Sequence, residues 1–262
     1  MSSDPMNYFT KENLDTYLRE LAKEYRKRGG KAMPVEIVLI GGAAILVNYG
    51  FREMTTDVDA EIHAASVVKD AINHVGDKFG LPNRWLNADF MCTASYTPKL
   101  DQYSIYYRTF SNILTVRTVT AEYLIAMKLR AGRKYKHDFS DIIGILAEHE
   151  KQGDPITSES IDTAVRNLYG GWDSIPKDAV NFIQNVLQSG NYEQVYDSIV
   201  AEEQRTKDIL VEFEREHPGV VNMNNADSIV EDLVTGQDSK AAILELLQKR
   251  VDRKLHSLKI TI

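Results

Sequence analysis

The residues that decide the fold are VEIVLIGGAAILVNYGFREMTTDVDAEIH, which run from Val35 to His63. Val35 to Ile40 are apolar and mostly β-branched, which predicts a mostly buried strand that ends at Gly41-Gly42. Ala43 to Tyr49 then predict a short helix. Asp57 to His63 alternate polar with small or apolar residues, and this period of two indicates a second strand.

The residues around this stretch predict more helices and two more strands. Apolar residues at helical spacing predict an opening helix from Leu14 to Tyr25, with Thr10 as its N-cap. In chain order we then expect a helix at Val67–Val75, strands at Tyr103–Arg108 and Ile113–Thr118, and helices at Ala121–Ala131 and Phe139–Glu150. The fold class is therefore α/β (α+β).

The pattern becomes helical from about Gly153 onward. We expect helices at Ser158–Leu168, Pro176–Ser189, Tyr192–Glu216, Ala226–Val234 and Lys240–Leu258. A chain of 262 residues is long enough for two domains. We place the boundary at this change of pattern, which gives a first domain over residues 1–152 and an all-helical C-terminal domain over residues 153–262.

Composition excludes several classes of protein. The hydrophobic fraction of 43% and the charged fraction of 26% are typical of a folded chain, and the single cysteine, Cys92, excludes an internal disulfide. The start of the chain has no secretory pattern, and no stretch is long and apolar enough for a membrane span. We therefore expect a cytoplasmic protein with no membrane partner.

The net charge of -7 is unevenly distributed. Residues 1–150 carry as many Lys and Arg as Asp and Glu, so the acidic excess belongs to the rest of the chain. Basic residues gather at Arg26-Lys27-Arg28 and between Lys128 and Lys136. Such clusters suit phosphate binding, and they equally suit solvated helix ends.

The candidate functional residues are the two glycines Gly41-Gly42 and the two aspartates Asp57 and Asp59. A strand that ends in two glycines before a helix exposes backbone N–H groups to a phosphate, although the same pattern also forms simple tight turns. Asp57 and Asp59 are two apart on a strand, so their carboxylates share a face and suit Mg²⁺; a solvated charged strand is the alternative.

Taken together, Gly41-Gly42 and Thr56-Asp57-Val58-Asp59-Ala60 resemble the nucleotidyltransferase superfamily that contains DNA polymerase β and the CCA-adding enzymes. The resemblance implies a small mixed sheet flanked by helices. It also implies that Gly41 and Gly42 hold the triphosphate of an NTP, and that Asp57 and Asp59 are catalytic residues that bind one or two Mg²⁺ ions.

A second resemblance covers Thr120 to Ile143, through Ala121-Glu122-Tyr123-Leu124-Ile125-Ala126-Met127-Lys128-Leu129, Ala131-Gly132-Arg133, Asp138 and Asp141-Ile142. This segment is similar to one in a bacterial group of nucleotidyltransferases related to abortive-infection toxins. This resemblance implies that Lys128, with Arg133 as a helper, approaches the nucleotide phosphates. The sequence equally suits a structural role for Lys128, in which its aliphatic stem covers the core. We expect Asp138 and Asp141 to brace the helices by pairing with Arg130, Arg133 or Lys134.

The superfamily adds a third carboxylate on a neighbouring strand, and the two later strands contain no Asp or Glu. Asp89 and Asp101 flank these strands without a compelling spacing. The six histidines show no metal-ligand spacing, and no Walker or dinucleotide-binding motif is present, so other enzyme classes are disfavoured.

The functional hypothesis is Mg²⁺-dependent transfer of a nucleoside monophosphate from an NTP to RNA, such as a tRNA 3′ end, or to a protein hydroxyl. The second resemblance implies that the protein is a toxin of a toxin-antitoxin or phage-defence system and that an antitoxin protein is its partner. The alternative is a nucleotide-binding or interaction protein of the same fold with weak or no turnover.

Overall fold

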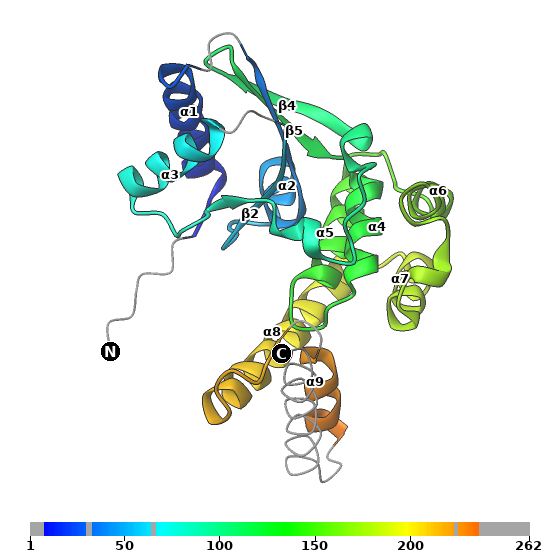
Figure 1. Cartoon of the computed structure of the whole chain (residues 1–262). Helices are drawn as coiled ribbons and strands as arrows, with labels where there is room; N and C mark the ends of the chain where they lie inside the picture. The colour runs from blue at the N-terminus through cyan, green and yellow to red at the C-terminus, as the bar shows by residue number, and fades with distance from the viewer. Residues whose placement is uncertain (1–7, 30–32, 64–66, 223–224, 236–262) are drawn as a thin grey trace, which may run out of the picture. The chain divides into compact units, whose positions relative to one another are not determined.

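The computed structural model describes residues 8–29, 33–63, 67–222 and 225–235 (Figure 1). It has a mixed α/β architecture, with one five-stranded sheet, helices packed around it, and a helical C-terminal part. The α/β class predicted from the sequence is confirmed.

The sheet has the strand order β3-β2-β1-β5-β4. The bounds are Val35–Leu39 for β1, Val58–His63 for β2, Leu86–Asn87 for β3, Ser104–Phe110 for β4 and Leu114–Val119 for β5. The central strand β1 runs antiparallel to β2 and parallel to β5. Its apolar side chains are buried on both faces, as the continuous apolar sequence predicts.

Helices α1 and α2 flank β1 in the chain. Helix α1, Lys11–Lys27, begins at a capping box in which Thr10 and Asn13 each accept a hydrogen bond from the other's backbone N–H. Helix α2, Gly41–Asn48, leads from β1 toward β2. Asn48 Nδ2 donates to Thr118 Oγ1 at 3.0 Å, which ties the end of α2 to β5.

The remaining helices follow the predicted order. They are α3 (Val67–Phe79), α4 (Ala121–Ala131), α5 (Asp138–Lys151), α6 (Ser158–Tyr169), α7 (Lys177–Ser189), α8 (Tyr192–Glu216) and α9 (Ala226–Thr235). Helices α1 and α3 lie side by side, and α4 packs against α6 and α7 (Figure 1). Helix α4 ends at Gly132, whose φ of 55° is the left-handed conformation common at helix ends.

The chain forms two compact units. One contains residues 1–132 and 141–193, and the other contains residues 133–140 and 194–262. These limits differ from the predicted domain boundary near residue 153, which stays a prediction. The second unit has a core of its own, formed by Leu210, Phe213, Ala226, Ile229 and Val230.

A buried carboxylate also stabilises the second unit. Glu203 Oε1 of α8 accepts hydrogen bonds from the backbone N–H groups of Phe139, at 2.9 Å, and Ser140, at 3.1 Å. Its Oε2 accepts from Ser140 Oγ at 2.6 Å. Phe139 and Ser140 lie in the first turn of α5, where N–H groups lack helical partners, so Glu203 caps that helix end.

The predicted helices and strands within the described residues are confirmed, with ends displaced by a few residues. The two-residue strand β3 and the short 3-10 helices at Asp89–Cys92, Leu100–Tyr103 and Trp172–Ser174 were not predicted, because elements this short lack a periodic pattern. The helix predicted at Lys240–Leu258 lies outside the described residues. Across the described part of the chain, no helix is long and apolar enough to cross a membrane.

Gly144 tests the packing of α5. A Cβ atom at this buried position would lie 2.5 Å from Cε2 of Phe51. Gly144→Ala normally favours a helix, but here we expect it to destabilise the protein by about 1–3 kcal/mol through this clash. Thermal unfolding of Gly144→Ala, alone and with Phe51→Leu, measures the effect. The smaller partner should restore stability, and an equal loss in both backgrounds would contradict the explanation.

Candidate functional site

The turn after β1 requires glycine. Gly41 begins α2 with φ at +56°, a left-handed conformation that other residues adopt only with strain. The N-cap residue Ile40 provides no side-chain hydrogen bond to the start of the helix. Because a helix start carries partial positive charge on its N–H groups, this turn suits an anionic ligand.

Strand pairing brings Asp59 to the glycine turn. The backbone N–H of Ile40 donates to the carbonyl of Asp59 at 3.0 Å, which aligns the end of β1 with the start of β2. A Cβ atom on Gly41 would lie 4.0 Å from Asp59 Oδ2. The turn and this carboxylate are therefore neighbours, as the predicted site requires.

Asp57 lies just before β2 and is exposed. Thr55 Oγ1 donates to Asp57 Oδ1 at 3.3 Å. A Cβ atom on Gly42 would lie only 2.6 Å from Thr55 Oγ1, so the glycine permits close approach of this loop. Gly41 thus adjoins Asp59, and Gly42 adjoins the threonine that contacts Asp57.

Lys128 is held by a buried carboxylate. Its Nζ lies 2.8 Å from Asp141 Oδ2, and the side chain of Asp141 is 3% exposed. Arg52 NH1 donates to both oxygens of Asp141, at 2.7 and 2.6 Å. The guanidinium of Arg52 also borders Gly42, with NH2 3.1 Å from a Cβ atom built there. Asp141 therefore connects Lys128 to the glycine turn through Arg52.

The predicted partners of Asp141 were wrong. The sequence indicated Arg130, Arg133 or Lys134, which are close in the chain, whereas Asp141 pairs with Lys128 and the distant Arg52. Since Lys128 is 8% exposed, it contributes little to a basic surface patch.

The prediction for Asp138 is confirmed, because Arg133 Nε donates to Asp138 Oδ2 at 2.8 Å. Arg133 belongs to the second unit, so its role with the nucleotide stays a prediction.

Sequence reasoning missed the parts played by Arg52 and Thr55, and it gave Asp141 the wrong cations. One available signal was the position of Asp141 beside Ile142 and Ile143, both fully buried. A charge in a buried helical segment needs a paired cation. The pattern gave no means of identifying Arg52, because its pairing depends on the path of the loop after α2.

Asp59, beside the glycine turn, and Asp57, two residues earlier in the chain, suit Mg²⁺, because this ion takes one or two protein carboxylates together with substrate phosphates. No group of three or more His, Cys, Asp or Glu side chains suited to a metal occurs among the residues that the structure describes. Asp89, one of the predicted candidates for a third ligand, is exposed and paired with Arg84.

Glu61 lies further along β2 and is buried. Burial raises the pKa of its carboxyl, nearby His63 lowers this pKa, and the negative charge of Asp101 raises it. His63 Nε2 is 3.6 Å from Glu61 Oε1. Asp101, the second candidate for a third metal ligand, therefore lies in the electrostatic environment of Glu61.

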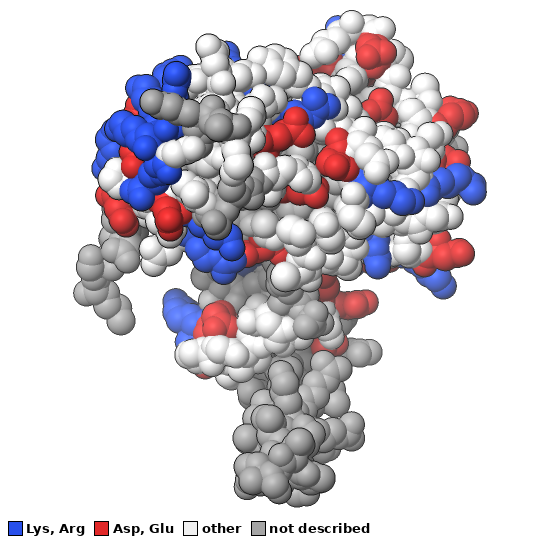
Figure 2. Space-filling view, turned by 45° about the horizontal axis from the view of Figure 1, so that its top comes forward, with Lys and Arg blue, Asp and Glu red and all other residues white. Residues whose placement is uncertain are grey.

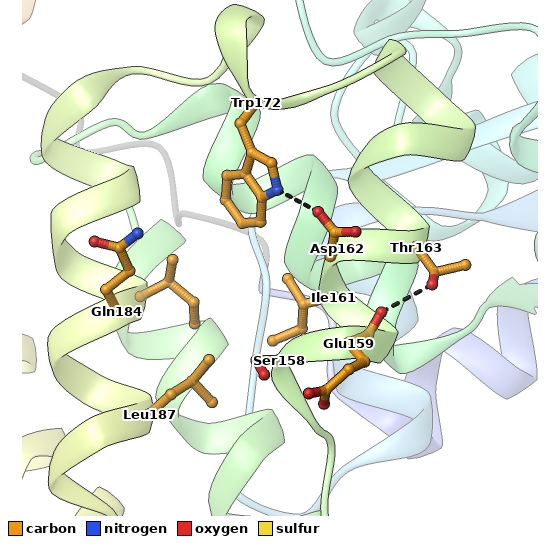
Figure 3. Close-up of a pocket in the computed structure, with 9 residues that line it drawn as sticks. Ser158, Glu159, Ile161, Asp162, Thr163, Trp172, Gln184 and Leu187 are labelled. Atoms are coloured by element: carbon orange, nitrogen blue, oxygen red, sulfur yellow. Dashed lines mark hydrogen bonds between the residues drawn. The ribbon is translucent and has the colours of Figure 1, made fainter.

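A groove of about 420 Å³ lies between α6 and α7 (Figure 3). Trp172 Nε1 donates to Asp162 Oδ1 at 2.7 Å on its wall. Glu159 adds a second carboxylate, and the lining residues include no Lys or Arg. This acidic lining does not suit a triphosphate, so the glycine turn is the better phosphate site.

Basic side chains gather over α1 and α3 (Figure 2). Exposed Lys23 and Lys78 each pair with Glu20 at 2.6 Å, while Lys27 and Arg28 pair with Glu24. These carboxylates offset much of the positive charge. The surface is therefore mixed in charge rather than strongly basic.

A comparison with known families identifies the chain as a nucleotidyltransferase. Residues 16–148, just over half of the chain, match the model of a family described as "Nucleotidyltransferase of unknown function (DUF6036)". The chain belongs to this family. No curated protein and no solved structure matches the chain.

Removal of the Asp141 charge should destabilise the protein. Asp141→Asn leaves Lys128 and Arg52 as two neighbouring cations in a buried setting, so we expect a loss of about 3–5 kcal/mol in the free energy of unfolding. Chemical denaturation measures it. Asp154→Asn is the matched control, since that side chain is 89% exposed, and its effect should stay within about 0.5 kcal/mol. Equal effects of the two variants would contradict the proposed importance of the pair.

Proposed function

We propose that this protein transfers a nucleoside monophosphate from an NTP to a hydroxyl group of RNA, such as a tRNA 3′ end, or of a protein, in a reaction that depends on Mg²⁺. The observation that carries the proposal is the approach of the Asp59 carboxylate to the glycine turn at Gly41. A phosphate-binding turn beside a cation-binding carboxylate is the arrangement that a metal-bound triphosphate needs.

Asp57 and Asp59 would hold Mg²⁺. When bound, the ion supplies charge neutralisation on the phosphates and lowers the pKa of a coordinated hydroxyl. The backbone N–H groups at Gly41 and Gly42 would bind phosphate oxygens, because the glycines have no Cβ to obstruct them.

Lys128 would orient the triphosphate as a fixed positive charge. Its pairing with Asp141 favours a defined position, since a buried lysine held at 2.8 Å has little rotamer freedom. Arg52 shares this carboxylate and borders Gly42, so it is a further candidate for phosphate contact.

The proposed reaction is a single displacement at the α-phosphorus. The acceptor oxygen forms a bond to phosphorus, and the bond between phosphorus and the oxygen bridging to the β-phosphate breaks. Pyrophosphate leaves with the electron pair, and the acceptor proton passes to solvent. Transition-state charge develops on the phosphate oxygens, where the turn and Lys128 would stabilise it.

The biological role we propose is that of a toxin in a bacterial toxin-antitoxin or phage-defence system, acting in the cytoplasm. This rests on the resemblance at Thr120 to Ile143. The second unit, with its own core, offers a surface for an antitoxin or for the acceptor.

A second candidate is a nucleotide-binding or interaction protein without turnover. It is favoured by one observation, that the described residues include no set of three carboxylates suited to metal. Such a protein would bind an NTP at the glycine turn without incorporating it.

Labelling separates these two functions. The protein is incubated with each labelled NTP, Mg²⁺ and either total tRNA or a protein extract. We expect incorporation by the wild type, and a decrease of more than about 100-fold in Asp57→Asn and Asp59→Asn, because each removes a metal ligand. Asp77→Asn, an exposed carboxylate on α3, is the control. Chelation of Mg²⁺ should abolish labelling. Labelling that survives both substitutions contradicts the proposed mechanism, and NTP binding without labelling favours the second candidate.

Lys128 has its own test. We expect Lys128→Ala to lower kcat/KM for the NTP by about 100-fold or more, because a charge directed at the phosphates is lost. Lys128→Arg should retain more activity, and Lys136→Ala, an exposed lysine nearby in the chain, should resemble the wild type. Circular dichroism establishes that each variant is folded. A folded Lys128→Ala protein with wild-type kcat/KM would show that the lysine only stabilises the core.

A further inference from the structure

Strand β3 places Asn87 beside Asp59. Strands β2 and β3 run parallel, and Asp59 is aligned with Asn87 in their register. Aligned residues of neighbouring strands are roughly 4.8 Å apart and point to the same face of the sheet. The preceding pair, Val58 and Leu86, is buried, whereas the aligned aspartate and asparagine are half-buried, as alternation along each strand predicts. The amide of Asn87 is therefore the neighbour of the proposed metal-binding carboxylate on this side of β2.

The side-chain oxygen of Asn87 already has a partner. It accepts a hydrogen bond from the backbone N–H of Asp89 at 2.7 Å. This bond fixes the orientation of the amide, because a half-turn would replace the oxygen with an NH2 group, which cannot accept. The amide nitrogen, Nδ2, has no partner among the residues that the structure describes. Asn87 can therefore offer N–H donors to a ligand.

Asp59 lies between Asn87 and the glycine turn. Strand β2 has β1 on one side and β3 on the other. Gly41 directly follows β1 and Ile40, and a Cβ atom on this glycine would lie 4.0 Å from Asp59 Oδ2. The turn and Asn87 thus flank the aspartate from opposite sides. A cation on Asp59 would have the phosphate-binding turn on one side and the amide donors on the other.

The proposed displacement assigns a different substrate group to each side. The attacking and leaving oxygens lie roughly in line, on opposite sides of the α-phosphorus. With the leaving pyrophosphate at Gly41, the acceptor reaches the phosphorus from the side of β3. This strand is an edge of the sheet, and Met91 and Cys92, shortly after it, are exposed. A large acceptor can therefore approach from this side.

An N–H donor suits a hydroxyl group that does not itself attack. A hydrogen bond donated to the attacking oxygen would withdraw electron density from it, so a neighbouring oxygen is the better partner. The 3′-terminal ribose of RNA has such a neighbour, because its 2′-hydroxyl accepts hydrogen bonds beside the 3′-hydroxyl. The side chains of serine, threonine and tyrosine carry a single hydroxyl. The asparagine therefore favours RNA over a protein as the acceptor.

We propose that Asn87 is an acceptor-binding residue, whose amide donates to the 2′-hydroxyl of a 3′-terminal ribose while the 3′-hydroxyl attacks. The proposal rests on the function proposed above, and it selects RNA from the acceptors named there. Asn87 takes no proton and contacts neither the NTP nor the cation. Its contribution is to align the attacking oxygen with the α-phosphorus.

Removal of the 2′-hydroxyl tests this contact. Total tRNA is prepared in two forms, one with the natural terminal ribose and one with a terminal 2′-deoxyribose, which keeps the attacking 3′-hydroxyl. Transfer from each labelled NTP with Mg²⁺ gives kcat/KM for the tRNA. We expect the wild type to use the natural form about 5- to 50-fold better, because the deoxy form leaves the amide donor without a partner.

Two substitutions of Asn87 locate the effect. In Asn87→Ala, kcat/KM should fall about 5- to 50-fold for the natural tRNA and less than about twofold for the deoxy form. Asn87→Asp keeps an oxygen for the Asp89 N–H but has no donor when ionised, so it should also lose the preference while this turn is preserved. Asn83→Ala, an exposed position before β3, should keep the preference. A purely structural role would lower activity on both forms of tRNA equally.

Binding of the NTP alone separates the acceptor from the nucleotide. Isothermal titration calorimetry with Mg²⁺ and no tRNA should give Asn87→Ala a Kd within about twofold of the wild type, which also establishes that the variant is folded. Substantially weaker NTP binding by folded Asn87→Ala and Asn87→Asp proteins would place Asn87 at the nucleotide and overturn the proposal.

The remaining outcomes distinguish this proposal from the function on which it rests. Equal use of both tRNA forms by the wild type, or a preference that persists in both Asn87 variants, overturns the proposal and leaves the proposed function intact. Labelling of a protein extract without labelling of tRNA does the same. Absence of labelling with every acceptor overturns the proposed function together with the role of Asn87.

Discussion

The structure around the proposed site depends on one buried carboxylate, Asp141. It accepts hydrogen bonds from Arg52, in the loop after α2, and pairs with Lys128 of α4. Burying three charged groups is costly unless each is paired, so this arrangement tolerates little displacement of the loop or of the two helices. Arg52 also borders Gly42, and so does Thr55, which donates a hydrogen bond to Asp57, so these ion pairs lie beside the proposed site.

Much of the fold was predictable because local patterns and tertiary contacts agree. The apolar run at Val35–Leu39 became the central strand, and the helix predicted at Ala121–Ala131 has the same limits in the structure. Strand β3 was not predictable, since two residues carry no period. The order of the strands also lay outside sequence reasoning, because pairing between distant segments leaves no trace in local spacing.

The candidate site also contains residues that the sequence predicted and residues that it missed. Gly41 and Asp59 were predicted from motifs, and the pairing of β1 with β2 explains why residues so far apart in the chain are neighbours. Arg52 and Thr55 were missed, because their contacts depend on an irregular loop. Glu61 was taken for part of an alternating strand. Alternation along a strand could not show that one oxygen of its carboxyl is buried without a hydrogen-bond partner among the described residues.

The division of the chain into units has a consequence for protein engineering. Residues 133–140 belong to the second unit, although the segments on both sides belong to the first. A fragment cut after residue 193 would keep the first turn of α5 but lose the Glu203 carboxylate that caps it. The reciprocal fragment would keep the carboxylate and lose the groups that it binds. Expression of either unit alone therefore requires a substitute cap at Phe139 and Ser140. A circular permutation that keeps residues 133–140 joined to the rest of the second unit is the other solution.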